Sequence, residues 1–103
     1  MNVDAQKIRR ESLRWYILLA LDKARPNKLV ENIVLSTMQA IYPDTTAQEI
    51  RVQLDYLEAR KMIELEKTPD NRWFAELNRL GIDLVEYTIN CEPGIARPDK
   101  YWS

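Results

Sequence analysis

Apolar and polar positions follow a helical period over the first quarter of the chain. Residues of the apolar stripe recur at intervals of four or five, and charged residues fill the positions between them. This pattern predicts a helix that Asp4 can cap and that ends at about Ala24. The stripe consists of Ile8, Leu13, Ile17 and Leu21.

The second half of this predicted helix, WYILLAL, is apolar on every side. A helix with no polar face is usually surrounded by other elements of its own domain. The alternative is that part of this surface packs against a second subunit. Both explanations remain open from the sequence.

A second helix is expected after the Arg25-Pro26-Asn27 segment, because proline removes a backbone donor and disfavours helical geometry before it. Asn27 can cap this helix, which we expect from about Lys28 to Ile41. Its predicted buried stripe consists of Leu29, Val30, Ile33, Val34, Met38 and Ile41.

Thr46 and Glu49 have the spacing of a capping box, in which each side chain satisfies the backbone amide of the other residue. The helix that follows is expected from Ala47 to about Lys61. Its predicted inner face carries Ile50, Leu54, Leu57 and Met62, and its predicted outer face carries Gln48, Arg51, Gln53 and Asp55.

Residues 62–67 and 72–77 alternate with a period of two, and Thr68-Pro69-Asp70-Asn71 between them is typical of a turn, so a β-hairpin is expected. Asn78 can cap a last helix that continues to about Tyr87. The remainder has two prolines and no sustained period, which favours an extended tail. We expect Tyr101 and Trp102 to pin that tail onto the body or onto a partner.

These elements predict a mainly α domain with a small β-hairpin, in the order of a winged helix-turn-helix domain. At 103 residues the chain is large enough for one domain with its own core. We therefore expect a winged-helix domain over residues 1–88 and an extended tail over residues 89–103.

Composition argues against an enzyme. The chain has no histidine, one cysteine (Cys91) and only two glycines, so it lacks a phosphate-binding glycine loop and histidine-based catalysis or metal ligation. We expect no catalytic residue, no metal and no cofactor. The single cysteine suits a reducing cytoplasm, and the longest apolar run, Trp15 to Leu21, is too short to cross a bilayer.

Double-stranded DNA is the expected partner, because the second helix of a helix-turn-helix unit lies in the major groove. Glutamine and arginine side chains on its outer face can hydrogen-bond to base edges. Threonines at its start, and cations on the hairpin or the preceding helix, can contact the phosphate backbone of the DNA. The expected DNA-contacting residues are Lys28, Thr45, Thr46, Gln48, Arg51, Gln53, Lys67 and Arg72.

Charge weakens this prediction. The net charge is −1, the helix over residues 47–61 is balanced, and residues 62–77 carry two cations against four carboxylates. Residues 1–30, by contrast, carry seven Lys/Arg against three Asp/Glu. Since phosphate neutralisation dominates non-specific affinity, we expect weak binding by a monomer and stronger binding by a homodimer formed through the first helix or the tail. The alternative function is a winged-helix protein–protein interaction module without DNA binding.

The stretch YLEARKMIELEKTPDNRWFAELNRLGIDLVE resembles the passage from helix through wing in ArsR-like winged-helix regulators, with Asn78 where threonine is common. The tail EPGIARPDKYW is similar to the C-terminus of small winged-helix proteins of Mu-like transposable phages and prophages. The resemblance implies a phage or prophage transcriptional regulator in a bacterial cytoplasm. It implies no metal site here, because the residues that bind metal in ArsR-type proteins have no counterpart.

Overall fold

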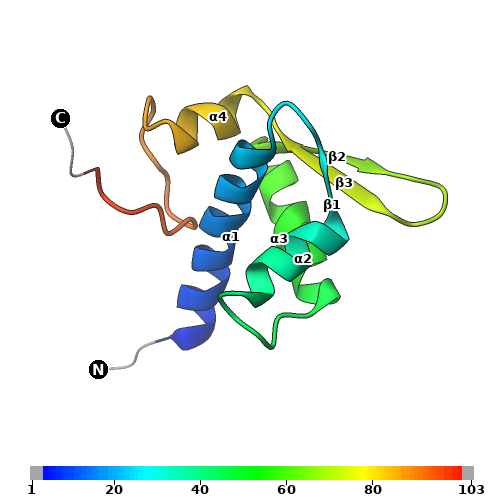
Figure 1. Cartoon of the computed structure of the whole chain (residues 1–103). Helices are drawn as coiled ribbons and strands as arrows, with labels where there is room; N and C mark the ends of the chain where they lie inside the picture. The colour runs from blue at the N-terminus through cyan, green and yellow to red at the C-terminus, as the bar shows by residue number, and fades with distance from the viewer. Residues whose placement is uncertain (1–3, 101–103) are drawn as a thin grey trace.

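Four helices and a three-stranded antiparallel sheet enclose one hydrophobic core in the computed structural model, which describes residues 4–100 (Figure 1). The domain is mainly helical, as the sequence predicts. In chain order the elements are α1 (Ala5–Ala24), β1 (Leu29–Val30), α2 (Glu31–Gln39), α3 (Ala47–Ala59), β2 (Ile63–Lys67), β3 (Trp73–Leu77) and α4 (Arg79–Val85).

Helix α1 has the bounds that the sequence predicts. The Asp4 side chain accepts a hydrogen bond from the Lys7 amide at 3.0 Å, and the helix ends at Ala24. Most of its apolar second half is covered within the chain: Trp15, Ile17, Leu18 and Leu21 are buried, whereas Tyr16 is 37% exposed. Ile8 departs from the prediction and is 53% exposed, because the core lies against the later turns of the helix.

The second helix begins later than predicted. Leu29 and Val30 form strand β1, which pairs with Ala75 and Phe74 of β3, so α2 starts at Glu31. Asn27 does not cap it; the cap position is Val30, which makes no side-chain hydrogen bond. Leu29 and Val30 pair with residues more than forty positions away in the sequence, and this pairing prevails over the local tendency of Asn27 to start a helix. Two residues of the predicted buried stripe, Ile33 and Ile41, are exposed.

Helix α3 follows its predicted cap, since Thr46 Oγ1 accepts from the Glu49 amide at 3.1 Å. The other half of the capping box is different: the Glu49 carboxylate accepts from Arg9 of α1 at 2.8 Å. The helix ends at Ala59, two residues before the predicted end, and Lys61 adopts a positive φ of 63°. The predicted inner face is confirmed: Ile50, Leu54, Leu57 and Met62 are all buried.

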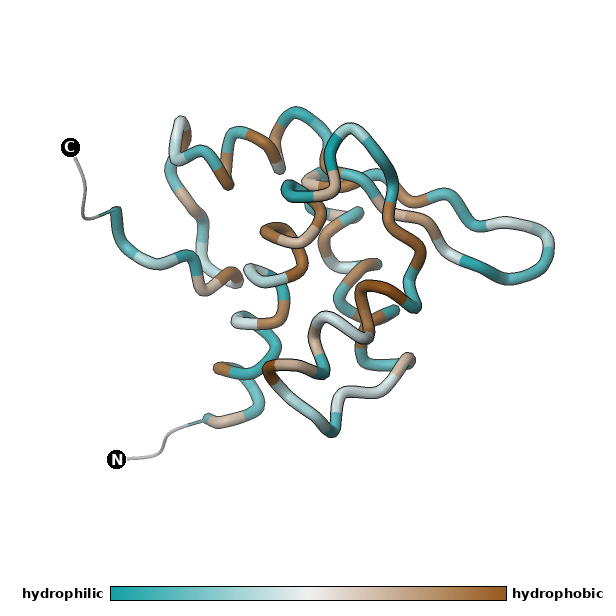
Figure 2. The backbone as a smooth tube through the Cα atoms, in the orientation of Figure 1, coloured by the Kyte–Doolittle hydropathy of each residue, from teal (hydrophilic) through white to brown (hydrophobic). Residues whose placement is uncertain are grey.

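The hairpin is formed as predicted by β2 and β3, and the sheet order is β1-β3-β2. Trp73, Ala75 and Leu77 point into the core at a period of two. The hairpin projects from the body, and its turn is hydrophilic (Figure 2). Asn71 in this turn has a φ of 65°, a conformation that asparagine tolerates better than most residues.

Asn78 caps α4 as predicted, its Oδ1 accepting from the Gly81 amide at 3.3 Å, and the helix ends at Val85 rather than Tyr87. The following chain returns across α1: Ile95 enters the core and the Ala96 amide donates to the Glu11 carbonyl at 3.1 Å. The predicted contacts of Tyr101 and Trp102 fall outside the described residues. Over residues 4–100, none of the helices is long and apolar enough to span a bilayer.

Candidate functional site: the face formed by α3 and the hairpin

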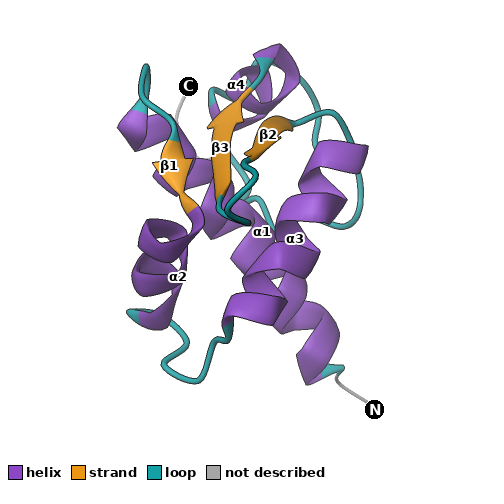
Figure 3. Cartoon of the chain, turned by 90° about the vertical axis from the view of Figure 1, so that its right-hand side faces the viewer, coloured by secondary structure: helices purple, strands orange, loops and turns teal. Residues whose placement is uncertain are grey.

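Helices α2 and α3 and the hairpin lie on one side of the molecule, with α1 behind them (Figure 3). The outer stripe of α3 on this side is uncovered and includes Gln48, Val52 and Asp55 at helical spacing. We call this stripe, together with residues 67–72 of the hairpin, the α3–hairpin face. It combines an exposed helix with a projecting β-ribbon.

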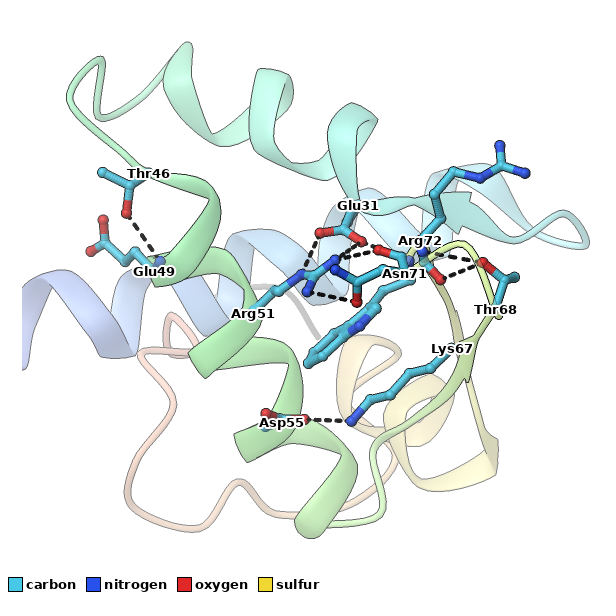
Figure 4. Close-up of polar contacts among 10 residues, drawn as sticks. Glu31, Thr46, Glu49, Arg51, Asp55, Lys67, Thr68, Asn71 and Arg72 are labelled. Carbon is cyan, nitrogen blue, oxygen red and sulfur yellow. Dashed lines mark hydrogen bonds and ion pairs between the residues drawn. The ribbon is translucent and has the colours of Figure 1, made fainter.

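An ion pair fixes the edge of this face. Arg51 Nε and Nη2 donate to Glu31 Oε1 and Oε2 at 2.6 and 2.8 Å, a two-pronged arrangement drawn in Figure 4. Glu31 is only 9% exposed, and its Oε2 also accepts from the Trp73 amide at 2.6 Å. Hydrogen bonding from Arg51 is the main reason that the pKa of Glu31 lies below its ordinary value. One carboxylate therefore joins α2, α3 and β3.

Arg51 also reaches the hairpin turn. Its Nη2 donates to the Asn71 carbonyl at 2.6 Å, and its guanidinium lies 4.5 Å from the centroid of the Trp73 ring. Lys67 lies 4.1 Å from the same centroid and bonds to Asp55 of α3 at 3.3 Å. These contacts fix the hairpin at a defined position beside α3, because cation–π and ion-pair contacts act on both of its strands.

The hairpin turn is braced internally. The Thr68 hydroxyl contacts the Asp70 carboxylate, and the Arg72 amide donates to Thr68 Oγ1 at 3.1 Å. Arg72 Nε bonds to Asp70 Oδ2 at 2.8 Å. These contacts hold the pKa of Asp70 below its ordinary value, chiefly through the Thr68 hydrogen bond.

Each cation that the sequence assigns to DNA contact is engaged by a carboxylate of the chain itself. The pairs are Lys28–Glu66, Arg51–Glu31, Lys67–Asp55 and Arg72–Asp70. Three of them are substantially exposed, whereas Arg51–Glu31 is not. The α3–hairpin face is consequently close to neutral.

Two predicted DNA-contacting residues, Thr45 and Gln53, are buried. Thr45 is buried, and its hydroxyl donates to the Tyr42 carbonyl at 2.6 Å, so the side chain closes the α2–α3 turn. Thr46 lies beside it, exposed, and caps α3. The prediction for Thr45 is therefore wrong, because its hydroxyl satisfies a local carbonyl and does not point outward.

The prediction that Gln53 contacts DNA is also wrong, because this side chain is 4% exposed and its Oε1 accepts from Arg14 Nε of α1 at 2.7 Å. Two residues along a helix correspond to a rotation of about 200°, so Gln53 lies on the opposite flank of α3 from Arg51. Helix α1 covers that flank. Of the predicted base-reading residues, Gln48 is exposed and Arg51 is partly exposed but already bonded.

The sequence prediction missed Glu31, Trp73 and Val52. Glu31 and Asn32 separate two apolar pairs, Leu29-Val30 and Ile33-Val34, and a carboxylate in such a setting is a signal of a buried, paired group. Val52 is 49% exposed in the middle of the outer stripe of α3. No sequence signal identifies it, because its neighbours on the outer stripe are polar.

Comparison of the chain with known protein-family models and with curated proteins gave no match. In the described part of the chain, His, Cys, Asp and Glu form no group of three or more that could hold a metal ion. The candidate site therefore rests on its geometry.

Proposed function

We propose that the chain is a winged helix-turn-helix protein that binds double-stranded DNA and acts as a transcriptional regulator. In this interpretation α2 and α3 form the helix-turn-helix, α3 enters the major groove, and the hairpin is the wing. The observation that carries the proposal is the uncovered outer stripe of α3, with Gln48 near its start, beside a hairpin that Arg51 holds in place.

The neutral charge of the face shapes the proposal. Exposed ion pairs contribute about 0–1 kcal/mol each, so Lys67 or Lys28 can exchange a carboxylate for a phosphate at small cost. Gln48 suits adenine, and the methyl groups of Val52 suit the thymine methyl. Binding is then weak and depends more on base contacts than on phosphate neutralisation. The resemblance of the sequence to Mu-like phage regulators supports a phage or prophage setting, and the excess of cations in residues 1–30 supports a homodimer that pools two such segments.

The test is selection of bound duplexes from a random DNA pool, followed by fluorescence anisotropy at low salt. Gln48→Glu and Val52→Glu should each weaken binding of the selected duplex at least about tenfold, because each places a carboxylate against the bases. Matched controls are Gln6→Glu and Ile8→Glu, which make the same changes at exposed positions of α1. No enrichment from the pool, or equal effects of the two sets, would falsify the proposal.

The second candidate is a protein-interaction module that uses the same fold without DNA. The observation that favours it is the paired state of the cations on the face together with exposed Val52 and Ile33, a mixed surface that resembles protein interfaces more than DNA-binding ones. Stoichiometric capture of one defined protein that Val52→Glu abolishes, with no enrichment from the DNA pool, selects this candidate.

A further inference from the structure

Arg14 of α1 is a buried cation whose hydrogen-bond and ring partners among residues 4–100 are all neutral. The residue is 8% exposed. Its Nε donates to Gln53 Oε1 at 2.7 Å and its Nη1 to the Gly94 carbonyl at 2.8 Å. Its guanidinium lies 3.5 Å from the centroid of the Tyr56 ring. Glu31, another buried charged residue, is by contrast paired with an opposite charge.

A buried charge without a counter-charge is unfavourable, because its hydration is lost and only dipoles replace it. Burial accordingly lowers the pKa of Arg14. The third nitrogen of the guanidinium group, Nη2, has no hydrogen-bond acceptor among residues 4–100. Every fully buried side-chain nitrogen in this part of the chain does have a partner, so Nη2 is not fully buried. Nη2 therefore reaches the surface with its hydrogen-bonding capacity unused.

Two further cations, Arg10 and Arg60, lie near Arg14. Arg10 lies one turn before Arg14 on α1, and Arg60 Nη1 donates to the Tyr56 hydroxyl at 2.7 Å. The positive charges of both neighbours act on Arg14 and lower its pKa, whereas Tyr56 and the carboxylate of Glu11 act in the opposite direction. Within the described residues neither Arg10 nor Arg60 forms an ion pair. Arg14 and Arg60 thus lie over the same Tyr56 ring, 3.5 and 5.4 Å from its centroid, with Arg10 one turn earlier on α1. None of the three is bonded to a carboxylate among residues 4–100.

Residue 94 lines this region closely. A Cβ atom added to Gly94 would lie 2.2 Å from the Tyr56 hydroxyl and 3.6 Å from Arg60 Nη1. The returning chain therefore forms one wall, α1 a second and the end of α3 a third. The arrangement is preorganised: the Arg14 guanidinium is held by packing and by two hydrogen bonds, so little side-chain entropy is lost when a ligand binds.

We propose that Arg10, Arg14 and Arg60 form a binding site for a phosphate group. Guanidinium groups match phosphate oxygens in planar, two-pronged contacts, and three of them suit a compact dianion better than a single carboxylate. The ligand supplies a negative charge bonded to Arg14, which no residue of 4–100 provides; Glu11, three residues earlier on α1, acts on Arg14 without a bond. The site lies on the flank of α3 that meets α1, where Gln53 bonds to Arg14, whereas the α3–hairpin face follows the outer stripe of Gln48, Val52 and Asp55. It therefore does not depend on the proposed DNA-binding function.

The experiment measures the thermal unfolding midpoint of the full chain in sodium phosphate and sodium pyrophosphate, against sodium chloride at equal ionic strength and pH. Phosphate should raise the midpoint beyond the chloride control, since a ligand of the native state stabilises it. Arg10→Gln and Arg60→Gln should each weaken pyrophosphate affinity, measured by calorimetry, about tenfold. Arg79→Gln, which removes a highly exposed cation from α4, is the matched control and should leave both measurements unchanged.

The variant Gln53→Glu tests the same proposal independently. It places a carboxylate where the amide oxygen now meets Arg14 Nε, which supplies the missing counter-charge from within the chain. The variant should unfold at a higher temperature than the wild type and should lose most of its response to phosphate. A response to phosphate no larger than to chloride, or one that survives in Arg10→Gln and Arg60→Gln, overturns the proposal.

Binding of duplex DNA to the same variants shows whether the site holds the phosphate of a nucleic-acid backbone or that of a free phosphate compound. If the site holds a nucleic-acid backbone, Arg10→Gln and Arg60→Gln should also weaken duplex binding and lower its salt dependence by about one ion each. If it holds a free phosphate compound, pyrophosphate binding falls and duplex binding is unchanged. Gln48→Glu should leave the phosphate response intact, so failure of the proposed function is distinguishable from failure of this site.

Discussion

Arg51 and Glu31 form two parallel hydrogen bonds of 2.6 and 2.8 Å between the second turn of α3 and the first residue of α2. The same carboxylate accepts from the Trp73 amide at the start of β3. A single side chain thus joins both helices to the hairpin. The position of the hairpin relative to α3 depends on this residue more than on any contact within the turn.

Glu31→Ala should lower the free energy of unfolding by about 3 kcal/mol, because it leaves the Arg51 charge and the Trp73 amide without their acceptor. The figure lies at the lower end for a buried pair, since a quarter of the Arg51 side chain is exposed. Urea unfolding measures it. Glu66→Ala, which breaks the exposed pair with Lys28, is the control and should cost no more than about 1 kcal/mol. Equal costs for the two variants would show that Glu31 has no special role.

Acid should remove the contribution of Glu31. The folded-state pKa of this carboxyl lies below the ordinary value of 4.5, so its stabilising effect is complete above that pH and is lost as the pH falls through the lowered value. The free energies of unfolding of the wild type and Glu31→Gln should differ at pH 7 and converge as the pH falls below 4.5. Curves that remain parallel over this range contradict the assignment.

The sequence predicts α1, α3 and the hairpin because their signals are local. The Thr46 cap, the apolar spacing after it and the turn at Thr68 to Asn71 each act within a few residues. Such signals do not need knowledge of the rest of the fold. The inner face of α3 (Ile50, Leu54 and Leu57) is therefore predicted correctly, and so is the burial of Met62 just after the helix.

The errors arise where distant segments decide the outcome. Leu29 and Val30 have spacing that suits a helix, but β3 offers them an open strand edge. Gln53 has the character of a surface residue, but Arg14 approaches from α1 and gives its amide a buried partner. Spacing along one helix cannot show which flank a second helix will cover, so the candidate site was predicted only in part.

Gly81→Ala should destabilise the chain by about 2 kcal/mol, although alanine normally favours a helix over glycine by about 1 kcal/mol. The reason is a close approach: a Cβ at this position would lie 2.1 Å from the Met62 carbonyl oxygen. Ser36→Ala, at an exposed position of α2, makes a helix-favouring change without a clash and should be slightly stabilising. Thermal or urea unfolding of both variants checks the sign, and a gain of stability in Gly81→Ala would contradict the packing at this site.

Removal of the carboxylates that engage Lys67 and Lys28 tests whether these cations limit DNA binding. Asp55→Asn and Glu66→Gln break the pairs at 3.3 and 2.8 Å without changing side-chain size. If the α3–hairpin face meets DNA, each variant should bind a selected duplex more tightly, with a salt dependence steeper by about one ion, because each frees a cation and removes a repelling charge. Asp83→Asn, which breaks the Arg79–Asp83 pair on α4, changes net charge equally and should have no such effect. Equal gains in all three variants would mean that net charge alone governs binding, whereas gains confined to the first two locate the duplex on α3 and the hairpin.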